Sequence, residues 1–306
     1  MNSELPIFAE VILTTEYFMN SVKRINPELL KKIKLVVFDV DGTLLSDEGT
    51  IGEKSFTLIK ELMKTDIKIS LASGRLHSAL VEIANLIGTP IPLISLDGAL
   101  IKNGKGDIIV HKSTLRKSIV NKSIELAEKY FVNIALCHSE AIYYTENNSL
   151  IPMILDKFGA LYKEVDSYDS CKENTLEIVF AGDNRRTMEY LRDRLSFPFV
   201  FGTSVSFFRS HSHENIYYLE IKKSGSTKAK GLIRLLKYLK LNPSDVMVIG
   251  DWYNDIPMFE TKAFKVAMAN AVPELKRMAD FVLTKSNNED GISEILETLL
   301  NAKRKK

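Results

Sequence analysis

Cysteine and tryptophan are scarce in this chain of 306 residues, which contains two cysteines and one tryptophan. Cys137 and Cys171 are too few, and too far apart in the sequence, to suggest a disulfide framework or a zinc site. We therefore expect two reduced thiols packed inside the protein. A reducing cytoplasm is the compartment that is consistent with them.

The chain also lacks a strong charge of either sign and a long apolar run. Its 41 basic and 39 acidic residues give a formal net charge of +2, and the basic residues are scattered. We therefore expect no nucleic-acid partner. No run approaches the roughly 20 apolar residues of a membrane-spanning helix, so we expect no membrane partner either. The sequence gives no indication of the oligomeric state.

The first 32 residues precede the pattern described below. Glu4, Glu10 and Glu16 interrupt their apolar residues, and no basic region precedes an uninterrupted apolar stretch. A signal peptide is therefore not predicted. We interpret residues 1–32 as an N-terminal extension whose helix packs on the outside of the molecule.

The chain contains two apolar runs, each followed closely by acidic residues. Residues 35–38 are typical of a buried parallel strand, and Asp39-Val40-Asp41-Gly42-Thr43-Leu44 follows at once. Residues 246–249 form a second such run, which ends in Gly250-Asp251-Trp252-Tyr253-Asn254-Asp255. Ligands of open α/β sheets bind at the carboxyl ends of the strands, and unpaired buried charge is costly. We therefore expect these acids to share one site with a divalent cation.

Strands and helices alternate on both sides of a central insertion, which predicts a parallel sheet with right-handed crossovers. In the first part we expect strands at 34–38, 67–71 and 92–94, helices at 53–63 and 76–86, and a hairpin around 103–106. In the last part we expect helices at 227–239, 255–261 and the C-terminal end, with strands at 246–249 and 265–268.

The pattern changes between these two parts. There we expect helices from 114 and at 185–195, and strands on either side of 138–140, at 176–180 and around 205 and 217. The predicted fold class is α/β, with a Rossmann-like core formed by residues 33–112 and 221–306. Residues 113–220 are predicted to form a large inserted α+β cap domain.

From about Lys34 to Leu300, the motifs and their order resemble the haloacid dehalogenase superfamily, and specifically its Cof-type (type IIB, C2-capped) phosphatases. The resemblance rests on the two acidic motifs and on five further features of the sequence. These are Ala72-Ser73-Gly74-Arg75, Ser95-Leu96-Asp97-Gly98-Ala99, Lys228 at a helix start, Ala267-Met268-Ala269-Asn270-Ala271 and Asn288-Glu289-Asp290-Gly291. It implies Mg²⁺ as cofactor and a small phosphorylated metabolite as substrate.

The resemblance assigns different chemistry to the two aspartates of the first motif. Asp39 would attack phosphorus and form an aspartyl-phosphate, which splits one hard step into two. Asp41, two residues further along an extended chain, projects to the same side and would act as the proton shuttle. Taken alone, the Asp-x-Asp-Gly-Thr pattern is equally typical of a strand that ends in a turn.

The metal ligands implied by the resemblance are Asp39, the backbone carbonyl of Asp41, and Asp251. Asp255 would hold a metal-bound water or orient Lys228, and Asn254 would reach the nucleophile or a phosphoryl oxygen. Because Asn and Asp also favour helix starts, N-capping is the alternative for Asn254 and Asp255, and it can coexist with a metal site.

Ser73, Gly74 and Lys228 are the predicted phosphate-binding residues, because a hydroxyl, an accessible backbone N–H and a cation all favour a phosphoryl oxygen. A serine N-cap with a glycine turn is the alternative for the first two. Lys223 and Lys230 compete with Lys228, because the family pattern usually has glycine directly after the lysine. Gly42, Thr43, Asn254 and Arg75 complete the predicted substrate contacts, although Arg75 could instead form an ion pair on a helix surface. Asn270 is similar to a family residue near the site or else forms a turn.

The predicted function is Mg²⁺-dependent hydrolysis of small phosphomonoesters, with a sugar phosphate as the default substrate. A phosphomutase would use the same two aspartates, and a non-catalytic sensor of a phosphorylated ligand would use the same pocket. A sensor has no need for both a nucleophile and a proton shuttle. Specificity is expected from cap side chains whose direction depends on strand register. The candidates are Tyr143, Tyr144, Arg209, Tyr217 and Glu220.

Overall fold

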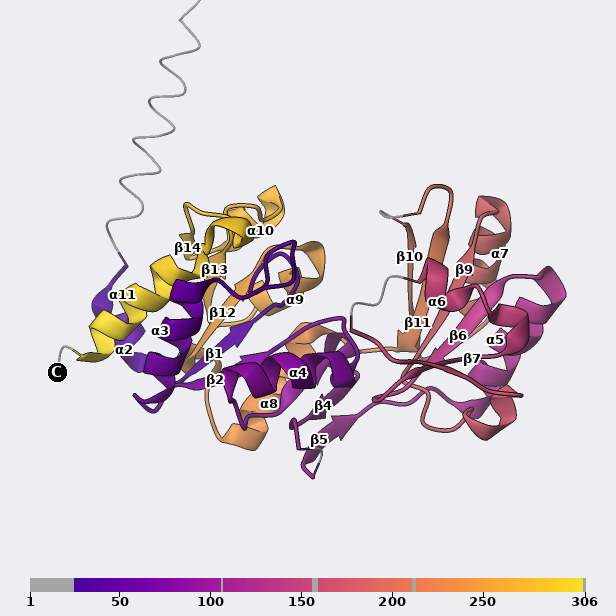
Figure 1. Ribbon diagram of the computed structural model, residues 1–306, viewed down its shortest axis with the longest axis horizontal. Helices are drawn as coiled ribbons and strands as arrows, with labels where there is room; N and C mark the ends of the chain where they lie inside the picture. The colour runs from indigo at the N-terminus through magenta and orange to yellow at the C-terminus, as the bar shows by residue number, and fades with distance from the viewer. Residues whose placement is uncertain (1–24, 106, 156–158, 211–212, 305–306) are drawn as a thin grey trace, which may run out of the picture. The chain divides into compact units, whose positions relative to one another are not determined.

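The computed structural model describes residues 25–105, 107–155, 159–210 and 213–304 of the chain (Figure 1). The chain divides into two compact units, which we call the first and the second unit. The first unit contains residues up to Ile69 together with Asn242–Lys306, and the second contains Ser70–Leu241. Residues 1–24 of the predicted N-terminal extension lie outside the described residues, and its last part forms the helix α2 (Pro27–Lys32).

A five-stranded sheet forms the centre of the first unit, in the order β14-β13-β12-β1-β2. Its strands are β1 (Leu35–Phe38), β2 (Lys68–Leu71), β12 (Val246–Gly250), β13 (Phe264–Ala267) and β14 (Phe281–Val282). Every residue of β1 and β12 is buried, as their apolar runs predicted. These two strands pair in parallel, with Leu35 opposite Val246 and Phe38 opposite Ile249. The residues that follow them therefore leave the sheet side by side.

Helices pack around this sheet, and α11 (Ile292–Arg304) contacts both α3 (Glu53–Met63) and α2 (Pro27–Lys32) (Figure 1). The bounds of α3 are the predicted ones. The helix expected at 255–261 is a 3₁₀ turn, η5 (Tyr253–Asp255), followed by the short α9 (Ile256–Phe259). The sequence did not predict α10 (Pro273–Met278) or β14. A helix of six residues and a strand of two half-buried residues are too short to show a periodic pattern of apolar residues.

A six-stranded sheet dominates the second unit, in the order β10-β11-β9-β6-β7-β8. Its strands are β6 (Asn133–Cys137), β7 (Ile142–Tyr144), β8 (Tyr162–Glu164), β9 (Glu177–Gly182), β10 (Thr203–Arg209) and β11 (Tyr217–Lys223). The helices α5 (Lys117–Tyr130) and α7 (Arg185–Leu195) share a hydrophobic cluster with one face of it. The strands expected on either side of 138–140 are confirmed as β6 and β7, and these two strands pair antiparallel.

A small antiparallel sheet also belongs to the second unit. It consists of β3 (Leu93–Ser95), β4 (Leu100–Lys102) and β5 (Ile109–Lys112), and it contains the predicted hairpin. The helix α8 (Lys228–Leu239) contacts all three strands, and α4 (His77–Ile87) contacts β3. The division into two units places α4, β3–β5 and α8 together with the six-stranded sheet. The predicted domain limits instead followed the return of the strand–helix alternation along the sequence. Those limits stay a prediction.

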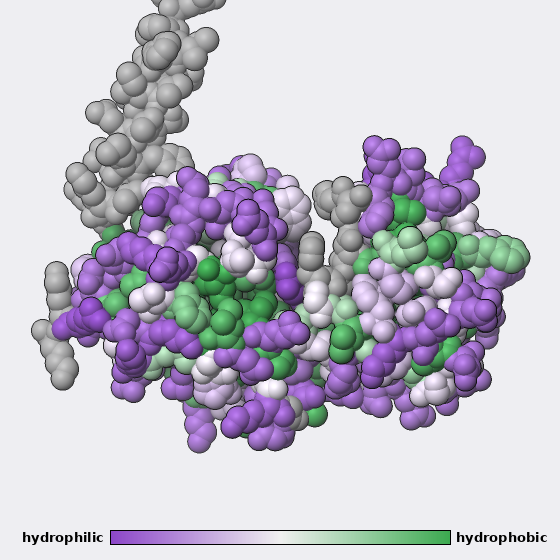
Figure 2. All heavy atoms as spheres, viewed as in Figure 1, coloured by the Kyte–Doolittle hydropathy of each residue, from purple (hydrophilic) through white to green (hydrophobic). Residues whose placement is uncertain are grey.

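The structure has Cys137 and Cys171 as buried thiols that are not joined by a disulfide, which confirms the expected packed cysteines. Among the described residues, no helix combines the length and the apolar character that crossing a bilayer would require. Hydrophilic side chains cover most of the face shown in Figure 2, with smaller hydrophobic areas between them.

Candidate active site

Three buried aspartates meet at the carboxyl ends of β1 and β12. Asp39 follows β1 directly and donates its backbone N–H to the carbonyl of Ile249 at 2.9 Å. Asp39, Asp251 and Asp255 each offer a carboxylate oxygen within 4.8 Å of the other two. Their residues are 4%, 6% and 0% exposed. Because three buried carboxylates repel one another and are costly to desolvate, this cluster favours a bound divalent cation.

Two glycines make room for these carboxylates. Gly42 has φ +75°, a conformation that L-residues rarely adopt, and a Cβ on it would lie 2.4 Å from Oδ2 of Asp251. A Cβ on Gly250 would lie 2.5 Å from Oδ2 of Asp255. The glycine of each acidic motif is therefore explained by the position of an acid from the second motif.

Hydrogen bonds fix the second pair of acids. The hydroxyl of Thr43 donates to Oδ1 of Asp251 at 2.7 Å. The backbone N–H groups of Asp251 and Trp252 donate to Oδ2 of Asp255 at 3.0 and 3.2 Å. Asp255 thus braces its own loop and also belongs to the acidic cluster, although its side chain makes no capping hydrogen bond to α9. Its metal role stays a prediction. The hydroxyl proton of Thr43 is engaged, and its predicted phosphate contact stays a prediction.

The loop after β13 supports both acidic motifs. The side-chain amide of Asn270 donates to the carbonyl of Gly42 at 2.8 Å and accepts from the backbone N–H of Asn287 at 3.2 Å. The backbone N–H of Val272 donates to the carbonyl of Asp251 at 2.9 Å. Asn287, which the sequence did not single out, donates to the carbonyl of Leu45 at 3.0 Å. Asn270 therefore positions the site through the backbone of the first motif.

The Asn288–Gly291 motif is a brace rather than part of the cluster. Asp290 accepts from the backbone N–H groups of Lys54 and Ser55 at 3.0 and 3.2 Å, which caps the N-terminus of α3. Asn288 donates to Asp47 at 2.9 Å, and the amide donors of Asn288 and then Asn287 hold the pKa of that carboxyl below its usual value. The motif ties the C-terminal region of the chain to the segment that follows β1.

Two predicted site residues lie outside the group of three carboxylates. Asp41 and Asn254 are both exposed. An exposed carboxylate suits a proton shuttle, which has to exchange its proton with water. The roles of Asp41 as shuttle and backbone ligand, and of Asn254 as a phosphate contact, stay predictions.

In the second unit, the Ser73–Arg75 loop is tied to the segment that follows β3. The hydroxyl oxygen of Ser73 accepts from the backbone N–H of Arg75 at 3.1 Å. The carbonyls of Ser73 and Arg75 accept from the backbone N–H groups of Asp97 and Leu96, each at 3.0 Å. The N-cap of α4 is Leu76, so the serine N-cap proposed as the alternative is wrong, and Ser73 forms a local turn with Arg75 instead. This turn leaves the hydroxyl proton of Ser73 able to point to an acceptor such as a phosphoryl oxygen.

Burial distinguishes Lys228 from its two competitors. Lys228 is 1% exposed, whereas Lys223 and Lys230 are exposed. A Cβ on Gly98 would lie 2.5 Å from the carbonyl of Thr227, so the first turn of α8 packs directly on the segment that pairs with the Ser73–Arg75 loop. Burial therefore favours Lys228 as the phosphate-site lysine, a role that stays a prediction.

The glycine of this helix also has a local reason. A Cβ on Gly231 would lie 2.5 Å from a methyl carbon of Ile94. Glycine is needed there for the close approach of α8 to β3.

An ion pair that the sequence did not predict lies beside the same loop. The ammonium of Lys222 is 2.7 Å from Oδ2 of Asp97 and 3.6 Å from Oε2 of Glu220. The carboxylate of Asp97 in turn lies 3.6 Å from where a Cβ on Gly74 would be. The segment that was expected to face a small molecule thus carries a lysine-paired carboxylate.

The observed register answers which cap side chains share a face. Tyr143 and Tyr217 pack against the cluster formed with α5 and α7. Glu220 lies one residue from Leu219 and Ile221, which belong to that cluster, so it points to the opposite face. Tyr144 packs on that opposite face. Of the candidates for specificity, Glu220 and Tyr144 therefore face away from α5 and α7.

A family model described as haloacid dehalogenase-like hydrolase matches residues 36–296. The chain therefore belongs to the haloacid dehalogenase-like hydrolases, which confirms the predicted family and places the protein among enzymes. The α/β fold with a parallel sheet is confirmed as well.

Named relatives and solved structures extend this result. Phosphatase YwpJ of Bacillus subtilis is 24% identical over 88% of this chain and 100% of its own length. Stress response protein YhaX of the same organism is 25% identical over 89% of this chain and 95% of its own. The crystal structure of TM0651 from Thermotoga maritima has a TM-score of 0.75 and 25% identity, and it covers 87% of this chain and 97% of that one.

Proposed function

We propose that this protein is a Mg²⁺-dependent phosphatase that hydrolyses small phosphomonoesters, such as a sugar phosphate, through an aspartyl-phosphate formed at Asp39. The observation that carries the proposal is the buried group formed by Asp39, Asp251 and Asp255, whose carboxylate oxygens lie within 4.8 Å of one another. The name of Phosphatase YwpJ of Bacillus subtilis supports phosphatase activity.

The three carboxylates fit Mg²⁺, because a small hard cation prefers oxygen ligands and often takes one or two carboxylates together with phosphate oxygens. Asp39 and Asp251 would hold it, with the backbone carbonyl of Asp41 as a third ligand and Asp255 supporting the site. When bound, the ion neutralises charge on the phosphoryl oxygens and so lowers the repulsion of an attacking anion. The position of Asp251 is preset by Thr43, so this ligand has little freedom to lose when the ion binds.

The chain's own residues then divide the reaction into two steps. In the first, a carboxylate oxygen of Asp39 forms a bond to phosphorus, the bond to the leaving oxygen breaks, and Asp41 gives that oxygen a proton. In the second, Asp41 takes a proton from water, whose oxygen attacks phosphorus and releases Asp39 and inorganic phosphate. By the family resemblance, Ser73 and Lys228 would bind phosphoryl oxygens.

The test is hydrolysis of a small activated aryl phosphate by the full chain with Mg²⁺, compared with D39N and D66N. The amide side chain of the D39N variant cannot attack phosphorus, so the rate should fall by at least about a thousandfold, which corresponds to about 4 kcal/mol of barrier. Asp66 is an exposed residue at φ 63°, where asparagine is well tolerated, so D66N should keep the wild-type rate. A D39N rate above about a tenth of the wild-type rate would rule out Asp39 as the nucleophile.

A further inference from the structure

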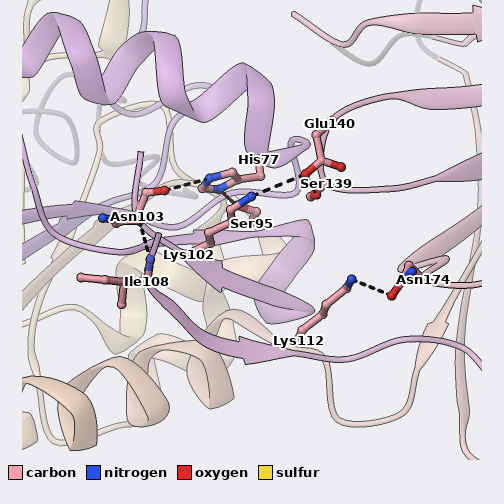
Figure 3. A network of polar contacts seen from close by, with 9 residues as sticks. All are labelled: His77, Ser95, Lys102, Asn103, Ile108, Lys112, Ser139, Glu140 and Asn174. Atoms are coloured by element: carbon pink, nitrogen blue, oxygen red, sulfur yellow. Dashed lines mark hydrogen bonds and ion pairs between the residues drawn. The ribbon is translucent and has the colours of Figure 1, made fainter. Parts of the chain in front are cut away.

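His77 is a buried histidine of the second unit that the proposed reaction does not use. It is the first residue of α4, two residues after Arg75, and it is 4% exposed. Its Nδ1 lies 3.2 Å from the hydroxyl of Ser95, and its Nε2 lies 3.2 Å from the backbone carbonyl of Asn103 (Figure 3). Both ring nitrogens are therefore engaged inside the protein.

The chemistry of the two partners fixes which nitrogen carries the proton. The carbonyl of Asn103 can only accept a hydrogen bond, so Nε2 of the neutral ring must donate to it. Nδ1 is then an acceptor, and the hydroxyl of Ser95 must donate to Nδ1. Among charged groups, Lys102 and Glu140 face the ring, and they pair with each other at 3.5 Å (Figure 3). Burial of the ring lowers the pKa of His77 most, and the positive charge of Lys102 lowers it further, to about 4. The ring is therefore neutral near pH 7.

The bond to Ser95 extends a regular ladder. The carbonyl of Ser73 pairs with the N–H of Asp97, the carbonyl of Arg75 pairs with the N–H of Leu96, and the ring of His77 pairs with Ser95. The N–H of Ser73 also donates to the carbonyl of Ile94 at 2.9 Å, so Ser95 lies within the stretch 94–97 that bonds to the loop. The backbone of His77 belongs to α4, so it is the side chain of His77, through Nδ1, that contacts this segment at Ser95.

Leu96 and Asp97 hold the left-handed conformation, with φ of 47° and 50°. Such residues persist only where their surroundings fix them, because the conformation costs free energy in L-residues other than glycine. Leu96 and Asp97 make two backbone bonds to the Ser73–Arg75 loop, and the carbonyl of Ile94 accepts a third from the N–H of Ser73 at 2.9 Å. Ser95 lies between Ile94 and Leu96, so a change at Ser95 would reach the loop through a bonded neighbour on either side.

We propose that His77 is a positioning residue for phosphate binding, which holds the Ser73–Arg75 loop in register through Ser95. This inference rests on the proposed function, because that function gives the loop its role. It assigns His77 no contact with substrate. The bond to Asn103, by contrast, supports the turn of the β4–β5 hairpin, where Asn103 also accepts from the N–H of Ile108 at 3.1 Å.

Two substitutions separate the two bonds of the ring. In H77Q, the amide nitrogen takes the place of Nε2, which keeps the donor for Asn103 and removes the acceptor for Ser95. In H77N, the amide oxygen takes the place of Nδ1, which keeps the acceptor for Ser95 and removes the donor. S95A removes only the hydroxyl and is a small change. His138 is the matched control, because it is a half-buried histidine of the same unit whose Nε2 donates to the carbonyl of Cys171 at 2.8 Å.

The experiment measures KM for a small aryl phosphate and the inhibition constant of inorganic phosphate in full-length variants. H77Q and S95A should raise both constants by about tenfold with a smaller change in kcat, whereas H77N and H138Q should stay within about twofold of wild type. Equal effects of H77Q and H77N, or constants for H77Q within about twofold of wild type, would overturn the proposal.

Amide hydrogen exchange gives a readout that does not depend on activity. The amides of Leu96 and Asp97 should exchange at least about tenfold faster in H77Q and S95A than in wild type and H77N. Unchanged exchange in S95A would overturn the proposal even if H77Q failed to fold. If the wild type hydrolysed no phosphate ester, the proposed function would fail, and the exchange rates would still decide whether His77 holds the loop.

Discussion

Replacing Gly42 with alanine tests how closely the first acidic motif is fitted to Asp251. At φ +75° an L-residue costs about 1–2 kcal/mol. The added Cβ would lie 2.4 Å from Oδ2 and 2.9 Å from Cγ of Asp251, a buried carboxylate that Thr43 holds in place. Relief of such overlap in a packed region typically costs about 1–3 kcal/mol. We therefore expect G42A to lower the free energy of unfolding by about 2–5 kcal/mol.

Gly49 supplies the matched control, because it has φ +78° and no atom within 4 Å of a Cβ built on it. G49A should cost only the conformational term of about 1–2 kcal/mol. Urea unfolding followed by the fluorescence of Trp252, the only tryptophan of the chain and the neighbour of Asp251, reports on the first unit. Unfolding free energies of the two variants within about 0.5 kcal/mol of each other would refute the proposed fit to Asp251. G42A should also lower Mg²⁺-dependent hydrolysis, whereas G49A should retain it.

Two further predictions concern the metal and pH. EDTA should stop hydrolysis and Mg²⁺ should restore it, with Ca²⁺ a poor substitute because its looser and larger ligand shell misplaces the reacting oxygens; undiminished activity in EDTA would contradict the metal site. His77 has a folded-state pKa of about 4 and an ordinary value of 6.5, so the unfolded chain binds its proton first as the pH falls. Because of His77, the free energy of unfolding should fall as the pH is lowered from 6.5 to 4, by up to about 3 kcal/mol, and should not change with this group above pH 6.5. H77N should lack this part of the pH dependence when unfolding is followed by circular dichroism at several pH values, and an identical pH dependence in both proteins would refute it.

The parts of the fold that the sequence predicted are those that local pattern determines. Each of the two fully apolar runs became a buried strand, because a strand buried on both faces needs no alternation. The helices at 53–63 and 185–195 have their predicted bounds. Their ends are set by nearby residues, such as Asn184, whose side chain accepts from the N–H of Thr187 at 3.1 Å. The acids of the cluster were found because they follow those strands.

The parts that the sequence could not predict depend on contacts between distant segments. Lys222 meets Asp97, which is 125 residues earlier in the chain, and no local pattern relates the two. His77 pairs with residues 18 and 26 positions later, and its place in an apolar helix gives no sign of a polar role. The direction of Glu220 depended on strand register, which a shift of one residue would have reversed. Such details require the packed structure.

Trapping the aspartyl-phosphate at Asp39 tests the central claim most directly. Borohydride reduces an acyl phosphate to an alcohol, so borohydride added during turnover of an aryl phosphate with Mg²⁺ should convert an aspartyl-phosphate to homoserine. Mass spectrometry of the peptides should then find homoserine at position 39, only when substrate and Mg²⁺ are both present. Homoserine at position 41 instead, or an actively hydrolysing protein in which no aspartate is reduced, would contradict the assignment of Asp39 as the nucleophile.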